Sequence, residues 1–280
     1  MVLSLLYRGA GSVPLEVEGI TPSRLAGRPC GEIERLPVLC GNRLARLGDF
    51  FDVSGSPSDD RMEWGGDLAG VHGIGAGLDG GFVRVSGNVG RHAGSRMTGG
   101  TLHILGHAAD WLGCEMRGGS IEVDGCVGHL AGAAYRGSPT GMRGGTILVR
   151  GSAGHELGAR MRRGVIAVDG AVGDLAGFQM RAGTILVGGR CGGRAAAGMV
   201  RGTLALLGGH TPPSLPNFRY GCRFRHPAFP LLRNLVRAGR LQRLAEALEE
   251  EVELYHGDMV TGGRGEVLWR DPPAATSGRS

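Results

Sequence analysis

The sequence contains no lysine, so all 31 of its basic residues are arginine. Aromatic residues make up only 5% of the chain, and there is no run of about 18 consecutive apolar residues that could span a membrane. The amino-terminal residues lack the basic and apolar stretches of a secretory signal, and we therefore expect a cytoplasmic protein. The net charge of +5 on 280 residues is only mildly basic, and we expect neither nucleic acid nor a membrane as a partner.

Residue patterns typical of catalysis or metal binding are also missing. The six cysteines never approach Cys-x-x-Cys spacing, and we expect most of them to be small, buried apolar side chains. The nine histidines form no His-Glu-x-x-His or related motif, and neither a P-loop nor a nucleophile elbow occurs. The sequence therefore predicts no catalytic residue, no metal ligand and no cofactor bound by this chain.

Glycine, in contrast, is abundant, at 55 of the 280 residues. It recurs within a repeat of 19 residues, with one interval of 26, and lacks the strict three-residue period of collagen. The copies begin at residues 78, 97, 116, 142, 161, 180 and 199.

Each copy contains a short alternating apolar segment closed by glycine. The first copy has Val83 and Val85 at the alternating positions, and every later copy has Leu, Ile or Val there. A period of two predicts a β-strand with one buried face, and stacked copies bury that face continuously. We therefore predict a mainly β fold, a parallel β-helix or β-solenoid with 19-residue glycine-rich coils.

The repeat also predicts the organisation of the chain. We expect a small amino-terminal cap over residues 1–55, the β-solenoid over 56–210, and a Pro-rich connector with a helical extension over 211–280. The connector is Thr211–Pro216, and the helical patterns cover Pro227–Ala238 and Gly239–Tyr255. These helices would cap the end of the solenoid and protect its exposed edge.

Stacking aligns two kinds of polar residue. Asp110 lies one coil from His129, and His155 lies one coil from Asp174. Each pair either meets across neighbouring coils or consists of ordinary exposed corner residues, and the sequence leaves both interpretations open.

The second set is an arginine column, which directly follows the methionine at the start of four copies. Like charges about 5 Å apart are unfavourable unless water, acidic neighbours or a bound anion screens them. The column is therefore either an ordinary solvated face or a basic surface for an acidic partner or polyanionic carrier. Its members are Arg117, Arg143, Arg162 and Arg181.

Two runs are specific enough to indicate a family. Asp110–Met116, and Gly132–Gly137 with the following Gly141-Met142, resemble the C subunit of formylmethanofuran dehydrogenase, and the 26-residue interval matches an insertion in that family. The tail from Tyr255 to Leu268 resembles its bacterial branch, the C subunit of a formyltransferase/hydrolase complex. The resemblance covers roughly residues 47–210. A more distant resemblance is to the glycine-rich carboxy-terminal β-helix domain of glutamate synthase.

The resemblance implies a non-catalytic structural subunit in one-carbon metabolism. Its partners would be catalytic formyltransferase and hydrolase- or dehydrogenase-like subunits, which transfer a formyl group from tetrahydromethanopterin to a methanofuran-type carrier and release formate. The carrier's glutamate-rich tail would be a ligand for the arginine column. The alternatives are a scaffold of an archaeal-type molybdenum or tungsten formylmethanofuran dehydrogenase, or a glutamate synthase-like domain.

Two functions of other classes fit the repeat less well. A carbohydrate-active β-helix enzyme needs converging carboxylates and aromatic side chains, which the repeat does not supply. An adhesin or antifreeze module needs a regular threonine ladder, but Phe82 and Val165 interrupt the partial ladder here.

Overall fold

The computed structural model describes residues 2–9, 13–56, 60–208 and 216–270. The strands are β1 (Leu3–Tyr7), β2 (Leu15–Glu16), β3 (Pro37–Cys40), β4 (Arg43–Arg46), β5 (Phe51–Ser54), β6 (Arg61–Gly65), β7 (Val71–His72), β8 (Phe82–Val85), β9 (Thr101–Ile104), β10 (Ser120–Val123), β11 (Arg143–Val149), β12 (Arg163–Val168), β13 (Thr184–Val187), β14 (Arg201–Leu206), β15 (Arg219–Phe224), β16 (Val252–Gly257) and β17 (Arg264–Trp269). The helices are α1 (Pro22–Leu25), α2 (Cys30–Ile33), α3 (Phe229–Ala238) and α4 (Gln242–Ala247), with short 3₁₀ turns at Leu47–Asp49 and Met259–Thr261.

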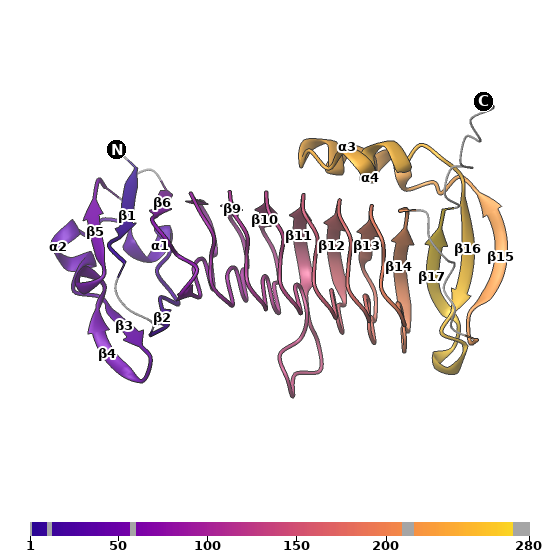
Figure 1. The fold of residues 1–280 in the computed structure, drawn as a ribbon, viewed down its shortest axis with the longest axis horizontal. Coiled ribbons are helices and arrows are strands. Elements are labelled where there is room, and N and C mark those ends of the chain that lie inside the picture. The colour runs from indigo at the N-terminus through magenta and orange to yellow at the C-terminus, as the bar shows by residue number, and fades with distance from the viewer. Residues whose placement is uncertain (1, 10–12, 57–59, 209–215, 271–280) are drawn as a thin grey trace, which may run out of the picture.

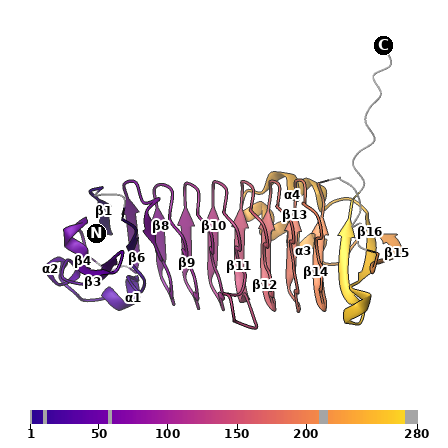
Figure 2. The same ribbon diagram turned by 60° about the horizontal axis from the view of Figure 1, so that its bottom comes forward.

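The fold is mainly β, as predicted, and is dominated by one sheet of 13 strands. Its order is β15-β16-β17-β14-β13-β12-β11-β10-β9-β8-β6-β1-β5, and a smaller sheet has the order β4-β3-β2-β7. The strands of the large sheet form a long row from the amino-terminal region to the carboxy-terminal strands (Figures 1 and 2). Neighbours from β1 through β14 to β17 pair in parallel, whereas β5 at one end and β15 and β16 at the other pair antiparallel.

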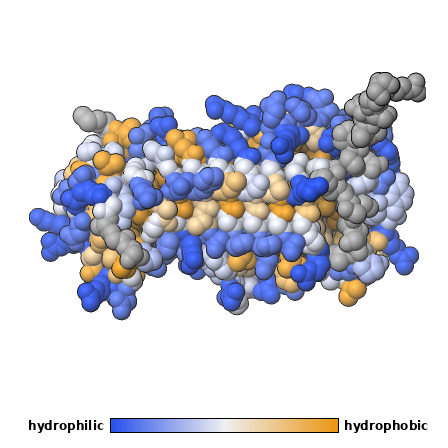
Figure 3. Space-filling model, in the orientation of Figure 1, coloured by the Kyte–Doolittle hydropathy of each residue, from blue (hydrophilic) through white to orange (hydrophobic). Residues whose placement is uncertain are grey.

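The repeat produces this row because equivalent residues pair in register. Val83 pairs with Leu102, which pairs with Ile121, and all three are fully buried. The methionine that begins each copy is also fully buried, as the sequence predicted, from Met97 to Met199. A second line of single parallel bridges connects the same repeats and involves Leu68, Val89, Ala108, Val127, Ala153, Val172 and Cys191. Rows of like hydropathy run along the molecular surface (Figure 3).

Close stacking explains why glycine precedes the strands. Gly119 has a φ of +85°, and a Cβ there would lie 2.6 Å from the carbonyl oxygen of Gly99 in the preceding repeat. A side chain at this position would both strain the backbone and separate the two repeats.

The helices α3 and α4 cover a face of the sheet, and the prediction that they cap its end is wrong. Figure 1 shows them along the side of the row, over β11 to β14. They bury Val236, Leu241 and Leu244 against an apolar cluster of the sheet that includes Leu148 and Leu186. The reason is that these outward-facing sheet positions are apolar and must be covered.

The carboxy-terminal extension also contains strands where a helix was predicted. The helix expected to continue to Tyr255 ends at Ala247, and β16 begins at Val252. Val252 and Leu254 alternate there as buried residues, Val252 opposite Phe224 of β15 and Leu254 opposite Leu268 of β17. Strand β17 then pairs with β14, so strands and not helices continue the row beyond the last repeat. Residues 211–215 of the predicted Pro-rich connector lie outside the described residues. The proposed boundaries near residues 55 and 210 stay a prediction.

The cysteines differ from expectation too. Only Cys114 is buried, whereas Cys126 and Cys222 are exposed and the other three are intermediate. Cys126 lies at a corner of the repeat, where its Sγ accepts a hydrogen bond from the backbone N–H of Ser152 at 3.3 Å. No helix among the described segments has the length and apolar character needed to cross a membrane.

Candidate functional site

The four predicted arginines follow one another along the edge where the strands begin, although the register of β11 and β12 shifts there and places Arg143 opposite Arg163. The backbone N–H of Arg143 donates to the carbonyl oxygen of Met116 at 2.6 Å, and Arg162 and Arg181 repeat this bond to the methionines one repeat earlier at 2.8 Å. All four side chains are exposed. Within the described part of the chain, none of them forms an ion pair or a side-chain hydrogen bond. The column is therefore accessible and not neutralised internally.

The predicted Asp and His pairs do meet, but through side chain and backbone. Asp110 Oδ1 accepts a hydrogen bond from the backbone N–H of His129 at 2.8 Å, and His129 Nδ1 accepts one from His155 at 2.9 Å. His155 Nδ1 then accepts from the backbone N–H of Asp174, and Asp174 Oδ1 from that of Gly193. Asp and His both serve at this position because each presents an acceptor to the backbone of the next repeat. These residues therefore connect neighbouring repeats, and the side chains of His155 and Asp174 also approach each other, with 4.0 Å between Nδ1 and Oδ2.

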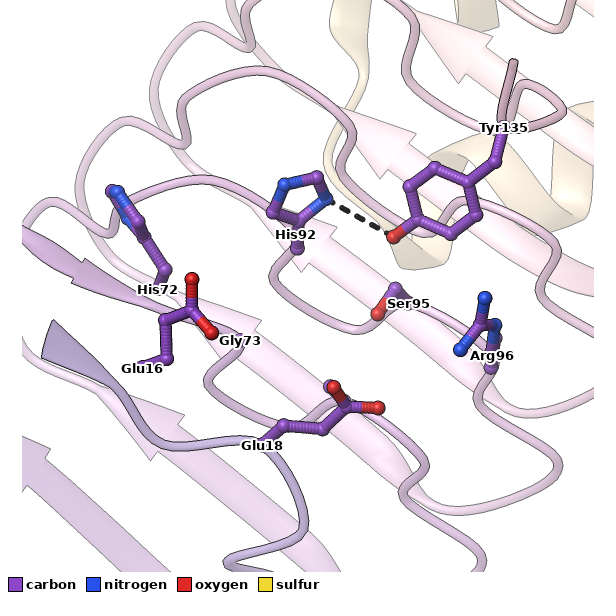
Figure 4. A pocket seen from close by; sticks show the side chains of 9 residues that line it. Glu16, Glu18, His72, Gly73, His92, Ser95, Arg96 and Tyr135 are labelled. Atoms are coloured by element: carbon purple, nitrogen blue, oxygen red, sulfur yellow. Dashed lines mark hydrogen bonds between the residues drawn. The ribbon is translucent and has the colours of Figure 1, made fainter. Parts of the chain in front are cut away.

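A pocket of about 260 Å³ opens where the amino-terminal segment meets the first repeats. Figure 4 shows side chains from several elements converging there. Glu16 is the last residue of β2, and Glu18 lies just beyond it. His72 is the last residue of β7. The corner of the next repeat contributes His92, Ser95 and Arg96. Tyr135 reaches in from the 26-residue interval. The pocket thus depends on the departure from the 19-residue period.

Burial keeps both histidines of this pocket neutral near pH 7. Burial lowers the pKa of His72, and the Arg91 cation lowers it further. Burial is likewise the main cause that lowers the pKa of His92, followed by the proximity of His72. His72 Nδ1 accepts a hydrogen bond from the backbone N–H of Arg91 at 3.0 Å, so the ring proton resides on Nε2.

Tyr135 connects the pocket to the aromatic residues of the corner. Its hydroxyl lies 3.0 Å from His92 Nδ1, and burial raises the pKa of Tyr135 to about 12. The donor of that hydrogen bond is set by which ring nitrogen of His92 carries the proton. The Arg96 guanidinium lies 5.2 Å from the centre of the Tyr135 ring and 3.4 Å from the Glu115 carboxylate.

The pocket offers donors and acceptors for a small polar group. Glu16 and Glu18 supply the carboxylate wall, with no ion pair to any residue in the described ranges. No group of three His, Cys, Asp or Glu side chains is arranged for a metal ion in the residues that the structure describes. Little in the sequence indicated this site, because His72 and His92 occupy different places in the repeat. The 26-residue interval was the available signal.

Comparison with known proteins identifies the family. No protein-family model matches the chain. The chain is 38% identical over 87 residues to the C subunit of the tungsten-containing formylmethanofuran dehydrogenase 2 of Methanothermobacter marburgensis, which is 30% of this chain and 32% of that protein. It is 33% identical over 92 residues to the C subunit of the molybdenum-containing formylmethanofuran dehydrogenase 1 of Methanosarcina barkeri, 31% of each chain. These matches thus span about a third of each relative.

A solved structure matches over nearly the whole length. The crystal structure of the formyltransferase/hydrolase complex (FhcABCD) from Methylorubrum extorquens, in complex with methylofuran, contains a chain that superposes with a TM-score of 0.89. Sequence identity is 33%, and the match covers 96% of this chain and 100% of that one. The fold is thus that of a component of a multi-subunit enzyme. The chain belongs to the family of formylmethanofuran dehydrogenase C subunits, as the sequence motifs indicated.

Proposed function

We propose that the chain is a non-catalytic structural subunit of a cytoplasmic formyltransferase/hydrolase complex. The observation that carries this proposal is the match of almost the entire chain to one component of the Methylorubrum extorquens complex. Other subunits would transfer the formyl group from tetrahydromethanopterin to a methanofuran-type carrier and release formate. The strands β15 to β17 also lie within the matched length, which favours this complex over the archaeal dehydrogenase, whose relatives match about a third of the chain.

We also propose that the stacked repeats form a parallel β-solenoid between the two end regions. Support comes from two lines of parallel pairing, one through the strands and one through the single bridges between later residues of the same repeats. Such a rod holds surface residues at fixed intervals of about 4.8 Å. It therefore suits a scaffold that presents rows of side chains to partners.

Within the complex, the arginine column would bind an acidic surface of a partner or the carrier's acidic tail. Arg181, at one end of the column, lines a groove of about 410 Å³ with Arg160, Gln179 and Val200. Two guanidinium groups beside an amide and an apolar wall suit a carboxylate on a partly apolar chain. The exposure of the column and its lack of internal partners support this role.

Co-expression with the catalytic subunits tests the subunit role. Native mass spectrometry should detect one assembly containing this chain, and the isolated chain should have no formyltransferase or hydrolase activity. Turnover by the isolated chain, or its absence from the purified assembly, would contradict the proposal.

The double substitution Arg143→Glu with Arg162→Glu tests the arginine column. We expect about tenfold or greater weakening of binding to an acidic subunit or to a short oligoglutamate peptide, with a smaller difference at high salt. The control is Arg28→Glu with Arg219→Glu, which makes the same charge change at exposed positions outside the column. Equal binding by the wild type and both variants would show that the column is an ordinary solvated face.

A further inference from the structure

The segment between β10 and β11 builds a pocket with apolar walls and a polar rim on the surface of the row. It is the part of the chain that lengthens one interval to 26 residues, and it projects from the row in Figure 1. The pocket has a volume of about 250 Å³. Its apolar walls are Trp111, Leu130, Ala134, Tyr135, Ala159 and Phe178.

Contacts on both sides hold this segment against the neighbouring repeats. The Tyr135 ring stacks on Trp111, with 5.4 Å between ring centres and 23° between the planes. The carbonyl oxygen of Ser138 accepts a hydrogen bond from Arg160 Nη1 at 2.9 Å, and Arg160 Nε donates to Gln179 Oε1 at the same distance. The pocket is therefore formed before any partner arrives, which lowers the entropic cost of binding.

The corner backbone does not itself require large apolar side chains. Trp111 and Leu130 have φ values of +68° and +63°, a conformation that large residues adopt at a cost of about 1 kcal/mol. Glu156 occupies the equivalent corner with a φ of +57°. A charged side chain is thus compatible with this turn. The half-buried Trp111, Leu130 and Phe178 instead form a small apolar cluster outside the main core, together with the buried Cys114 and Ala159.

The rim of the pocket is basic. Arg136 is exposed and, among the described residues, has no ion-pair partner, while Arg160 and Glu156 also line the pocket. Arg160 lines the groove that contains Arg181 as well. The pocket therefore shares Arg160 with the groove that contains Arg181 of the arginine column. A second copy of this chain would bring two basic surfaces together, whereas an acidic partner would complement them.

We propose that this pocket receives a large apolar side chain, flanked by carboxylates, from a partner subunit of the complex. Apolar side chains inserted into preformed pockets carry much of the binding energy of protein interfaces, and a charged rim orients the approaching segment. This inference rests on the proposed role as a subunit and adds where one catalytic subunit attaches.

The substitution Leu130→Glu tests the pocket, with Leu175→Glu as its matched control. Both leucines are half-buried, both have a φ of +63°, and each lies one repeat from Glu156, but only Leu130 lines the pocket. We expect Leu130→Glu to weaken binding of the catalytic subunits at least about tenfold and Leu175→Glu to change it less than about twofold. Binding is measured by interferometry with the full-length chain immobilised and thermal melts checking the fold.

Arg136→Glu provides a second measurement that does not alter the apolar walls. It should weaken binding several-fold at low salt and less at high salt. Failure of the wild-type chain to bind would overturn the proposed function and this inference with it. Undiminished binding by Leu130→Glu and Arg136→Glu, or equal losses in Leu130→Glu and Leu175→Glu, would overturn the inference alone. If Leu130→Glu does not fold, undiminished binding by Arg136→Glu overturns it.

Discussion

The outward face of the long sheet differs between its two halves. At the same position of successive strands, β8 to β10 have Arg84, His103 and Glu122, whereas β11 and β13 have Leu148 and Leu186. No described helix covers the polar half, whereas the apolar half lies beneath α3 and α4 (Figure 1). The inward-facing residues show no such change and are buried throughout. The repeat thus determines the inner face, and the outer face varies with what covers it.

Polar contacts attach the helices at defined points of the apolar half. Arg150 Nε donates to the carbonyl oxygen of Gly239 at 3.1 Å, and Asp169 Oδ1 accepts from the backbone N–H of Leu244 in the first turn of α4 at 2.9 Å. In an earlier repeat, Asp124 instead pairs with His103 and Arg150. Asp169 therefore binds a helix in the covered half of the sheet. The equivalent Asp124 binds side chains of the sheet where the two halves meet.

The largest effect should come from charging the covered half. Leu186→Glu would place a carboxylate at a fully buried position beneath the helices. We expect a loss of about 3 kcal/mol or more in the free energy of unfolding, because the apolar contact is lost and a charge is buried unpaired. Urea titration followed by circular dichroism measures it.

The reverse substitution, Glu122→Leu, is the control in the uncovered half. Glu122 occupies the strand position that Leu148 and Ala167 occupy in the next two repeats, and its side chain is only half-buried. We expect a change within about 0.5 kcal/mol. A comparable loss in both variants would mean that the two halves do not differ energetically.

A smaller effect should follow from removing the aspartate that binds α4. Asp169→Ala leaves the backbone N–H of Leu244 without its acceptor and removes a negative charge from a helix amino terminus, and we expect a loss of about 1–2 kcal/mol. Hydrogen exchange should show the loss of protection in α3 and α4. Asp124→Ala, at the equivalent position, should leave the α4 amides protected, and faster exchange of α4 in that variant would contradict this assignment.

The sequence predicted the inner face well because its signal repeats in every copy. Val83, Val85 and their equivalents follow a period of two that only a strand satisfies. The stripe of Leu241, Leu244, Leu248 and Val252 was ambiguous at its end, since Val252 also alternates with Leu254. Pairing with β15 and β17 decided for a strand from Val252 onward. The exposure of the arginine column followed from its place in the repeat. The pocket around His92 and Tyr135 did not, because it depends on how one insertion folds back.

The smallest effect concerns pH in the helix layer. His226 precedes α3, and its Nδ1 accepts a hydrogen bond from the backbone N–H of Ala228 at 3.2 Å. Burial lowers the pKa of His226 below its ordinary value of 6.5. The unfolded chain then binds more protons than the folded one, so stability is lost as the pH falls below 6.5 towards the lowered value. Hydrogen exchange, corrected for its intrinsic pH dependence, should show weaker protection of α3 at about pH 5.5 than at about pH 7.5. His226→Asn retains an acceptor without titrating, and an equal pH response in that variant would assign the effect to other groups.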